Sequence, residues 1–251
     1  MNDEVTPGPP AQEAAPAPRD SPFWSYSDLF VFVGLAVAAV FASVVLVRLV
    51  AWILHVRAHT IETLAAQFLM DGLVLGSLAL MFRVEYQRPF WRSLGWGRSG
   101  LPFLWMVIAG FATALGVGFA STLIKMPTTS NPMTEMMTDR NSVLLIAAFG
   151  VTLGPLSEEL VFRGFLQPLL VRSLGAVAGI LAASIPFGLL HFQEYGDSWP
   201  HVLLIAVAGA AFGVMRHATG STRASTIMHA SYNGLLFMGL LAQRKELPHL
   251  W

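Results

Sequence analysis

The sequence predicts an all-α membrane protein, a polytopic bundle of about seven, or eight, transmembrane helices around an intramembrane polar cavity. Of its 251 residues, 55% are hydrophobic and only 12% are charged, and the mean hydropathy is +0.60. Soluble domains carry about 25% charged residues. Apolar stretches recur at about the 20-residue length that a helix needs to cross a bilayer. Ionisable groups interrupt some of the later stretches, and such groups normally face a cavity and carry function.

Charge and cysteine usage exclude several other classes of protein. Fifteen basic and fifteen acidic residues cancel, which argues against nucleic acid as a partner. The chain has no cysteine, so disulfides, cysteine-bound zinc and thiol nucleophiles are excluded.

Residues 1–22 are rich in proline and alanine and show no apolar period. This composition predicts a disordered tail. It lacks the basic start and apolar run of a signal peptide, so we expect the first span to remain as an anchor.

The N-terminal transmembrane region, residues 23–140, contains three predicted spans. Two of them carry little or no charge, and the second holds Asp71, for which we expect a structural partner. The spans are Leu29–Val47, Leu64–Phe82 and Leu101–Ile124. Three glycines of the third span predict close helix packing: Gly110, Gly116 and Gly118.

The region 141–242 contains four further predicted spans and is the expected catalytic domain, followed by a short tail at 243–251. The first of these spans is interrupted by Pro155 and by two adjacent glutamates. The four spans are Ser142–Leu170, Leu174–Phe192, His201–Met215 and Ser225–Ala242.

Lysine and arginine are distributed unequally between the two faces that these spans define. Eight lie with the N-terminal tail and the loops at 83–100, 172–175 and 216–224, against five on the opposite side. Cytoplasmic loops carry the excess of these residues. We therefore expect a cytoplasmic N-terminus in a bacterial inner membrane.

Polar residues of three later spans are predicted to reach a common depth. Glu158 lies 14 residues before Arg172 and His191 lies 16 after Gly175, so both sit roughly 21–24 Å from one face. His229 and Asn233 reach roughly 9–15 Å, a difference that helix tilt can reconcile.

The paired glutamates are expected to have different roles. Glu159 and Arg163 are spaced i, i+4 on one helix face, so Arg163 can neutralise Glu159. Glu158 points about 100° away and is left to face the cavity, where a low dielectric favours a general base.

Hydrolysis of an amide needs a base for water and donors for the oxyanion. His191, His229 and Asn233 can supply the donors. Alternatively Glu158, His191 and His229 can bind zinc, because two histidines, one carboxylate and water form a known catalytic arrangement. The helical H-E-x-x-H signature is absent. Zinc stays open as an alternative, and no cofactor is favoured, since Asn233 is a poor zinc ligand and a good oxyanion donor.

Three motifs resemble those of the CPBP intramembrane proteases, which include the type II CAAX prenyl endopeptidases and the Abi proteins linked to bacteriocin self-immunity. They are E-E-x-x-x-R at 158–163, F-x-x-x-H at 187–191 and H-x-x-x-N at 229–233. The resemblance covers roughly residues 140–242. It implies a membrane endopeptidase in which Glu158 activates water, His191, His229 and Asn233 complete the site, and Glu159 and Arg163 support it. The family is commonly labelled metalloprotease, although a metal-free glutamate mechanism is also proposed for it.

The expected partners are membrane lipid and a membrane-tethered, for example prenylated CAAX-type, protein or peptide substrate. Two other functions compete with proteolysis: a non-catalytic scaffold or immunity factor that keeps the motifs, and a transporter with a buried proton relay. A transporter would be expected to show an inverted repeat, and none is visible. The sequence leaves the oligomeric state open.

Overall fold

The computed structural model describes residues 22–56, 58–127, 135–137 and 139–243, which are helical or looped and contain no strand. The all-α prediction is therefore confirmed for these residues. The predicted tails at 1–22 and 243–251 lie outside the described residues, apart from Pro22 and Gln243.

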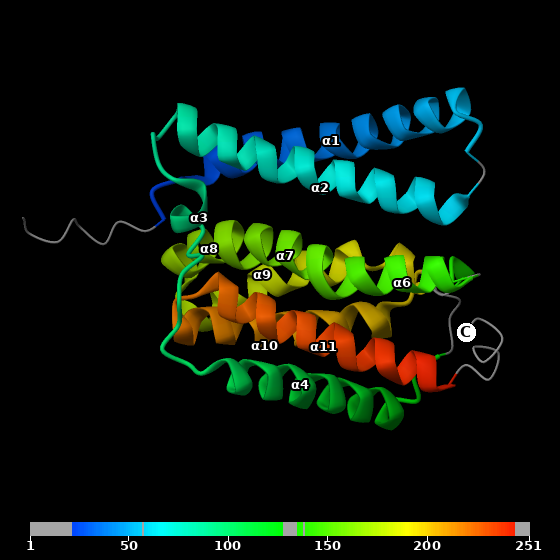
Figure 1. Cartoon of the computed structure of the whole chain (residues 1–251). Coiled ribbons are helices and arrows are strands. Elements are labelled where there is room, and N and C mark those ends of the chain that lie inside the picture. Colours follow the sequence, from blue (N-terminus) through cyan, green and yellow to red (C-terminus); the bar gives the residue numbers. More distant parts are fainter. Residues whose placement is uncertain (1–21, 57, 128–134, 138, 244–251) are drawn as a thin grey trace, which may run out of the picture.

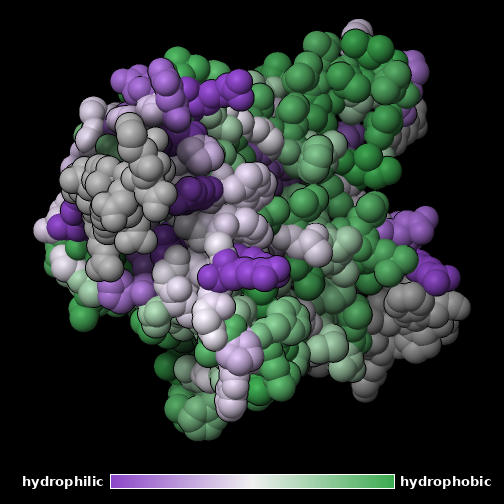
Figure 2. Space-filling view, turned by 60° about the vertical axis from the view of Figure 1, so that its left-hand side comes forward, coloured by the Kyte–Doolittle hydropathy of each residue, from purple (hydrophilic) through white to green (hydrophobic). Residues whose placement is uncertain are grey.

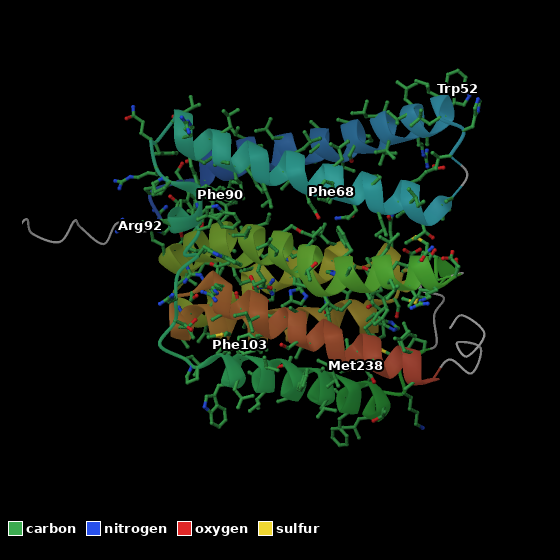
Figure 3. All side chains as sticks on the ribbon, in the orientation of Figure 1. Trp52, Phe68, Phe90, Arg92, Phe103 and Met238 are labelled. Atoms are coloured by element: carbon green, nitrogen blue, oxygen red, sulfur yellow. The ribbon has the colours of Figure 1, made fainter. Side chains whose placement is uncertain are left out.

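Helices α1 (Tyr26–Ile53) and α2 (His59–Val84) form an antiparallel pair at one edge of the molecule (Figure 1). At the start of α1 the Asp28 carboxylate accepts a hydrogen bond from the Ser25 backbone N–H at 2.8 Å, which gives that group a partner. Most large apolar side chains of α1 are exposed. Trp52, at its far end in Figure 3, is 74% exposed. An apolar outer face of this kind suits contact with lipid.

Helix α4 (Phe103–Leu123) follows the short α3 (Phe90–Ser93) and forms the opposite edge, beside α11 (Thr222–Gln243) (Figure 1). The turn before α11 is tied to the segment after α3, because the Thr222 N–H donates to the Gly95 carbonyl at 3.0 Å. These contacts hold α11 in place along the bundle.

A single glycine allows α4 and α11 to approach closely. A Cβ at Gly110 would lie 2.3 Å from the carbonyl oxygen of Met228. A Cβ at Gly116 or Gly118 would meet nothing within 4 Å. The packing prediction is therefore correct for Gly110 and wrong for the other two glycines, which lie away from the α11 contact.

The centre of the bundle is a continuous rod of 35 residues, Arg140–Leu174. Pro155 does not break it, because it occupies the first turn of a helical segment, where no backbone N–H is needed. Wider π-helical turns lie on both sides of that segment, and such turns are frequent at functional sites. In order the rod contains α6 (Arg140–Ala148), η1 (Phe149–Leu153), α7 (Gly154–Glu159), η2 (Leu160–Leu166) and α8 (Gln167–Leu174).

Helices α9 (Ala176–Leu190) and α10 (Trp199–Thr219) complete the bundle, joined by a loop that contains the 3-10 turn η3 (Gln193–Tyr195). They pack closely because a Cβ at Gly188 would lie 2.6 Å from the Val202 carbonyl oxygen. The loop between them therefore stays near the rod.

Seven long helical segments correspond to the seven predicted spans, and the protein is a multi-pass membrane protein. Helix α9 has 15 residues and is shorter than a typical span. The sixth span is longer than predicted, since α10 runs beyond both ends of 201–215. Five segments of the described chain are long and apolar enough to cross a bilayer by length and composition: α1, α2, α4, the rod and α10. Figure 2 shows hydrophobic surface along the helices, with hydrophilic residues gathered towards the end turned to the viewer.

Two buried clusters fix the helices around the rod. At one end, the indole N–H of Trp24 donates to the Phe165 carbonyl at 3.1 Å, and the Trp24 ring stacks on that of Phe165. Around the middle, Phe162, Phe187 and Phe212 pack between the rod, α9 and α10. The second cluster forms one wall of the cavity described next.

Candidate active site

A cavity of about 550 Å³ lies between α2, the rod, α9, α10 and α11. It is lined by the first third of α2, by residues 146–158 of the rod and by residues 229–240 of α11. It therefore lies nearer the face that carries residues 54–56, 124–127 and 191–198 than the arginine-rich face. The ionisable and amide side chains that line it are Gln67, Glu158, His191, Glu194, Tyr195, His229, Tyr232 and Asn233.

The two glutamates at the end of α7 point to different sides of the rod, as the helical spacing predicts. Glu159 is fully buried, whereas the side chain of Glu158 is 34% exposed and lines the cavity. One Glu158 oxygen, Oε2, has no hydrogen-bond partner in the described part of the chain. A buried carboxylate oxygen without a partner is costly, which favours a water or substrate group at that atom.

Glu159 joins two helices through a buried charge network. Its Oε1 lies 2.9 Å from Arg163 Nη1 and 3.1 Å from His229 Nδ1. Arg163 Nη2 donates to the Gly209 carbonyl at 2.7 Å, and the guanidinium lies 4.2 Å from the centre of the Phe187 ring. The predicted Glu159–Arg163 pair is thus present, and it also positions a histidine.

The orientation of His229 follows from that contact. A carboxylate only accepts, so His229 Nδ1 carries the proton and Nε2 faces the other way. Nε2 lies 3.9 Å from Oε2 of Glu158. The ring stacks on Phe212 with 4.4 Å between centres, which limits its rotation.

His191 ends α9 and also lines the cavity. Its Nδ1 lies 2.8 Å from the Phe187 carbonyl oxygen, which can only accept, so this nitrogen too is protonated. The Nε2 atoms of both histidines are therefore left for other partners.

Asn233 connects α11 to the wider turn η1. Its Nδ2 donates to the Gly150 carbonyl at 2.8 Å. A carboxamide has two N–H donors, so one remains for a ligand. The structure therefore brings Glu158, His191, His229 and Asn233 to one cavity, with part of the Asn233 amide already engaged.

Three cavity residues were missed by the sequence analysis: Glu194, Tyr195 and Tyr232. Burial raises the pKa of the Glu194 carboxyl and that of the Tyr195 phenol above their ordinary values, so the phenol stays a donor. For Glu194 and Tyr195 the available signal was the polar run Gln-Glu-Tyr, which begins two residues after His191, but it falls in a loop, where polar residues are common.

The predicted zinc ligands do not form a compact ligand group. Among the described residues, no cluster of three or more histidine and acidic side chains is placed to hold a metal ion. Both imidazoles do have the outer partners that metal-binding histidines use. Zinc held by Glu158, His191 and His229 remains the alternative that a metal analysis of the purified protein tests.

Asp71 of α2 has the structural partner that was predicted. Its Oδ1 accepts a hydrogen bond from Gln67 Nε2 at 3.1 Å. The Asp71 carboxyl on α2 is also close enough to the Glu158 carboxyl on α7 for the two groups to interact electrostatically. Asp71 thus lies behind the cavity wall to which Gln67 contributes.

Residues 140–235 match the family model described as type II CAAX prenyl endopeptidase Rce1-like. This range includes all three motifs and ends two residues after Asn233. No curated protein and no solved structure matched the chain.

Proposed function

We propose that this membrane protein is an intramembrane endopeptidase, because residues 140–235 match the family model of the Rce1-like type II CAAX prenyl endopeptidases, a protease family. It hydrolyses a peptide bond of a membrane-tethered polypeptide. One observation carries the proposal: Glu158 lines a cavity between the helices, and its Oε2, which has no hydrogen-bond partner among the described residues, lies 3.9 Å from Nε2 of His229.

Glu158 and His229 activate the attacking water together. Two acceptors 3.9 Å apart can both bind one water at about 2.8 Å each. Glu158 removes a proton as the water oxygen bonds to the carbonyl carbon. It then returns that proton to the amide nitrogen as the carbon–nitrogen bond breaks. Glu159 and Arg163 do not contact the attacking water. They position the His229 ring so that its Nε2 points towards the cavity.

Other donors that line the same cavity stabilise the oxyanion that forms on the carbonyl oxygen. The free N–H of Asn233 and the hydroxyls of Tyr195 and Tyr232 are available for this purpose. His191 contributes through Nε2, as a donor when its ring is charged and as an acceptor for water when neutral.

The remainder of the cavity is apolar and receives the membrane-tethered part of the substrate. Its walls are the side chains of Leu64, Leu236, Phe237 and Leu240, from α2 and α11. A prenyl or acyl chain, or an apolar peptide segment, gains free energy by burial there, at about 25 cal/mol per Å².

The protein lies in a bacterial inner membrane with its N-terminus in the cytoplasm. The arginine-rich loops support this orientation. The cavity lies nearer the opposite face, so the site opens away from the cytoplasm.

The proposed chemistry uses protein groups alone. A metal analysis of the purified protein tests this point: stoichiometric zinc together with chelator-sensitive cleavage would contradict it.

The decisive experiment compares the wild-type protein with Glu158→Gln in reconstituted membranes. The variant keeps the size of the side chain and removes the base. We expect cleavage to vanish while folding persists, and comparison of membrane proteomes should show precursors that accumulate. Glu85→Gln, an exposed change at the end of α2, is the matched control and should cleave normally. Full activity of Glu158→Gln would refute the role of Glu158.

A further inference from the structure

Glu194 is held at the cavity by the loop between α9 and α10. The Tyr195 N–H donates to the His191 carbonyl at 3.2 Å, and the Asp197 N–H donates to that of Phe192 at 3.0 Å. The Tyr195 ring stacks on His201 of α10, with 5.0 Å between centres. These contacts fix the loop at both ends, so the carboxyl of Glu194 keeps its place in the cavity wall.

Glu194 and Glu158 share this space. Each lines the cavity, and Glu194 interacts electrostatically with both His191 and Glu158. The scissile bond must lie beside Glu158, so Glu194 faces the substrate residues next to that bond.

The cavity lining is acidic. Among the described residues that line it, the carboxylic acids are Glu158 and Glu194, and neither lysine nor arginine is present. Arg163 does not neutralise the acidic lining, because it is not one of the lining residues and is paired with Glu159 and the Gly209 carbonyl. Histidine adds positive charge only when protonated.

An acidic cavity lining without lysine or arginine affects the binding of substrates that end in a free carboxylate. A peptidase that removes a C-terminal tripeptide has a free carboxylate about 10 Å beyond the scissile bond, at about 3.3 Å per extended residue. In this cavity that carboxylate would meet like charge and no basic side chain of the lining. Like charges in a partly desolvated site repel strongly.

We infer that Glu194 is a specificity-determining residue that excludes substrates with a free carboxylate within about three residues of the scissile bond. The inference rests on the proposed peptidase function. The favoured substrate is a membrane-tethered polypeptide cleaved at an internal bond, with neutral or basic residues following it. Removal of a C-terminal tripeptide from a prenylated protein is disfavoured.

Two probes test this inference in detergent micelles. Both are quenched fluorescent peptides with an S-farnesyl cysteine followed by three apolar residues. One ends in a carboxylate and the other in a carboxamide. For the wild-type protein we expect kcat/KM to be about tenfold higher for the carboxamide, the size of effect that one partly screened like charge produces.

The ratio should fall to about one to three in Glu194→Gln, because one like charge is removed while the side chain keeps its shape. Asp197→Asn is the matched control: it removes one charge from the same loop, at an exposed position outside the cavity lining, and should keep the wild-type ratio. Inhibition of the wild-type protein by a free apolar tripeptide needs no variant. The carboxamide form should inhibit more strongly than the carboxylate.

Equal or faster cleavage of the carboxylate probe by the wild-type protein would overturn the inference and leave the peptidase proposal standing. The same holds if Glu194→Gln leaves the ratio unchanged, or lowers both rates equally. Cleavage of neither probe by folded wild-type protein would instead count against the peptidase proposal, and the inference would fall with it.

Discussion

Removal of Arg163 should destabilise the protein more than any change of a surface arginine. The side chains of Arg163 and Glu159 are 1% and 0% exposed, and their atoms lie 2.9 Å apart. Arg163→Met keeps much of the apolar stem but leaves the Glu159 carboxylate buried without its main counter-charge. Breaking a buried pair in this way costs about 3–5 kcal/mol.

The expected size of the effect in a thermal scan follows from the length of the chain. For proteins of this size, each 1 kcal/mol shifts the Tm by about 2–4 °C, so Arg163→Met should lower it by about 6–20 °C. The Glu159→Gln/Arg163→Met double variant has no orphaned charge. It should recover at least half of that loss, which gives a favourable coupling term in a double-mutant cycle.

The assay is unfolding of detergent-solubilised protein, followed by far-UV circular dichroism at one scan rate for all variants, because unfolding that is irreversible makes the apparent Tm depend on scan rate. Arg92→Met is the control: Arg92 is exposed at the end of the bundle in Figure 3, and its loss should cost less than about 0.5 kcal/mol. The reasoning is refuted if Arg163→Met is no less stable than Arg92→Met, or if the losses in the double variant simply add.

Three further predictions concern packing, orientation and pH. Gly110→Ala should lower the free energy of unfolding by about 1–3 kcal/mol, because the new Cβ would lie 2.3 Å from a backbone oxygen of α11. Gly116→Ala places its Cβ in open space, so it should be neutral or slightly stabilising in the same thermal assay. The native chain has no cysteine, so the variants Gln193→Cys and Arg92→Cys each carry a single thiol. A membrane-impermeant maleimide added to intact cells should label the Gln193→Cys variant and not the Arg92→Cys variant. The reverse pattern would contradict a cytoplasmic N-terminus. Burial raises the pKa of the Glu194 carboxyl, so its charge appears only above the ordinary range of glutamate. The preference for the carboxamide probe should therefore grow as the pH rises above that range, and a preference that shrinks would be contrary to this reasoning.

Features that depend on spacing along one helix were predictable from the sequence. The i, i+4 separation of Glu159 and Arg163 determines that they meet, and the 100° step per residue determines that Glu158 points elsewhere. The apolar stretches likewise predicted seven helical segments, because hydrophobicity over about 20 residues is a property of the local sequence. Their ends were less predictable: α10 begins at Trp199, two residues before the expected span.

Features that join distant segments were decided by the tertiary structure. His229 lies 70 residues from Glu159 in sequence, and their contact exists only because α11 packs against α7. Gly110 is needed for close packing and Gly116 is not, because only the first faces α11.

The sequence by itself determined the membrane bundle, the buried Glu159–Arg163 pair and the residues of the three motifs, since helical periodicity and hydrophobicity act over short stretches of chain. Only the tertiary structure decided that Glu194 and Tyr195 share the cavity with Glu158, and that His229 contacts Glu159. The physical reason is that loop placement and the separation of side chains on different helices depend on how whole helices pack. That packing is the sum of many weak contacts between distant residues.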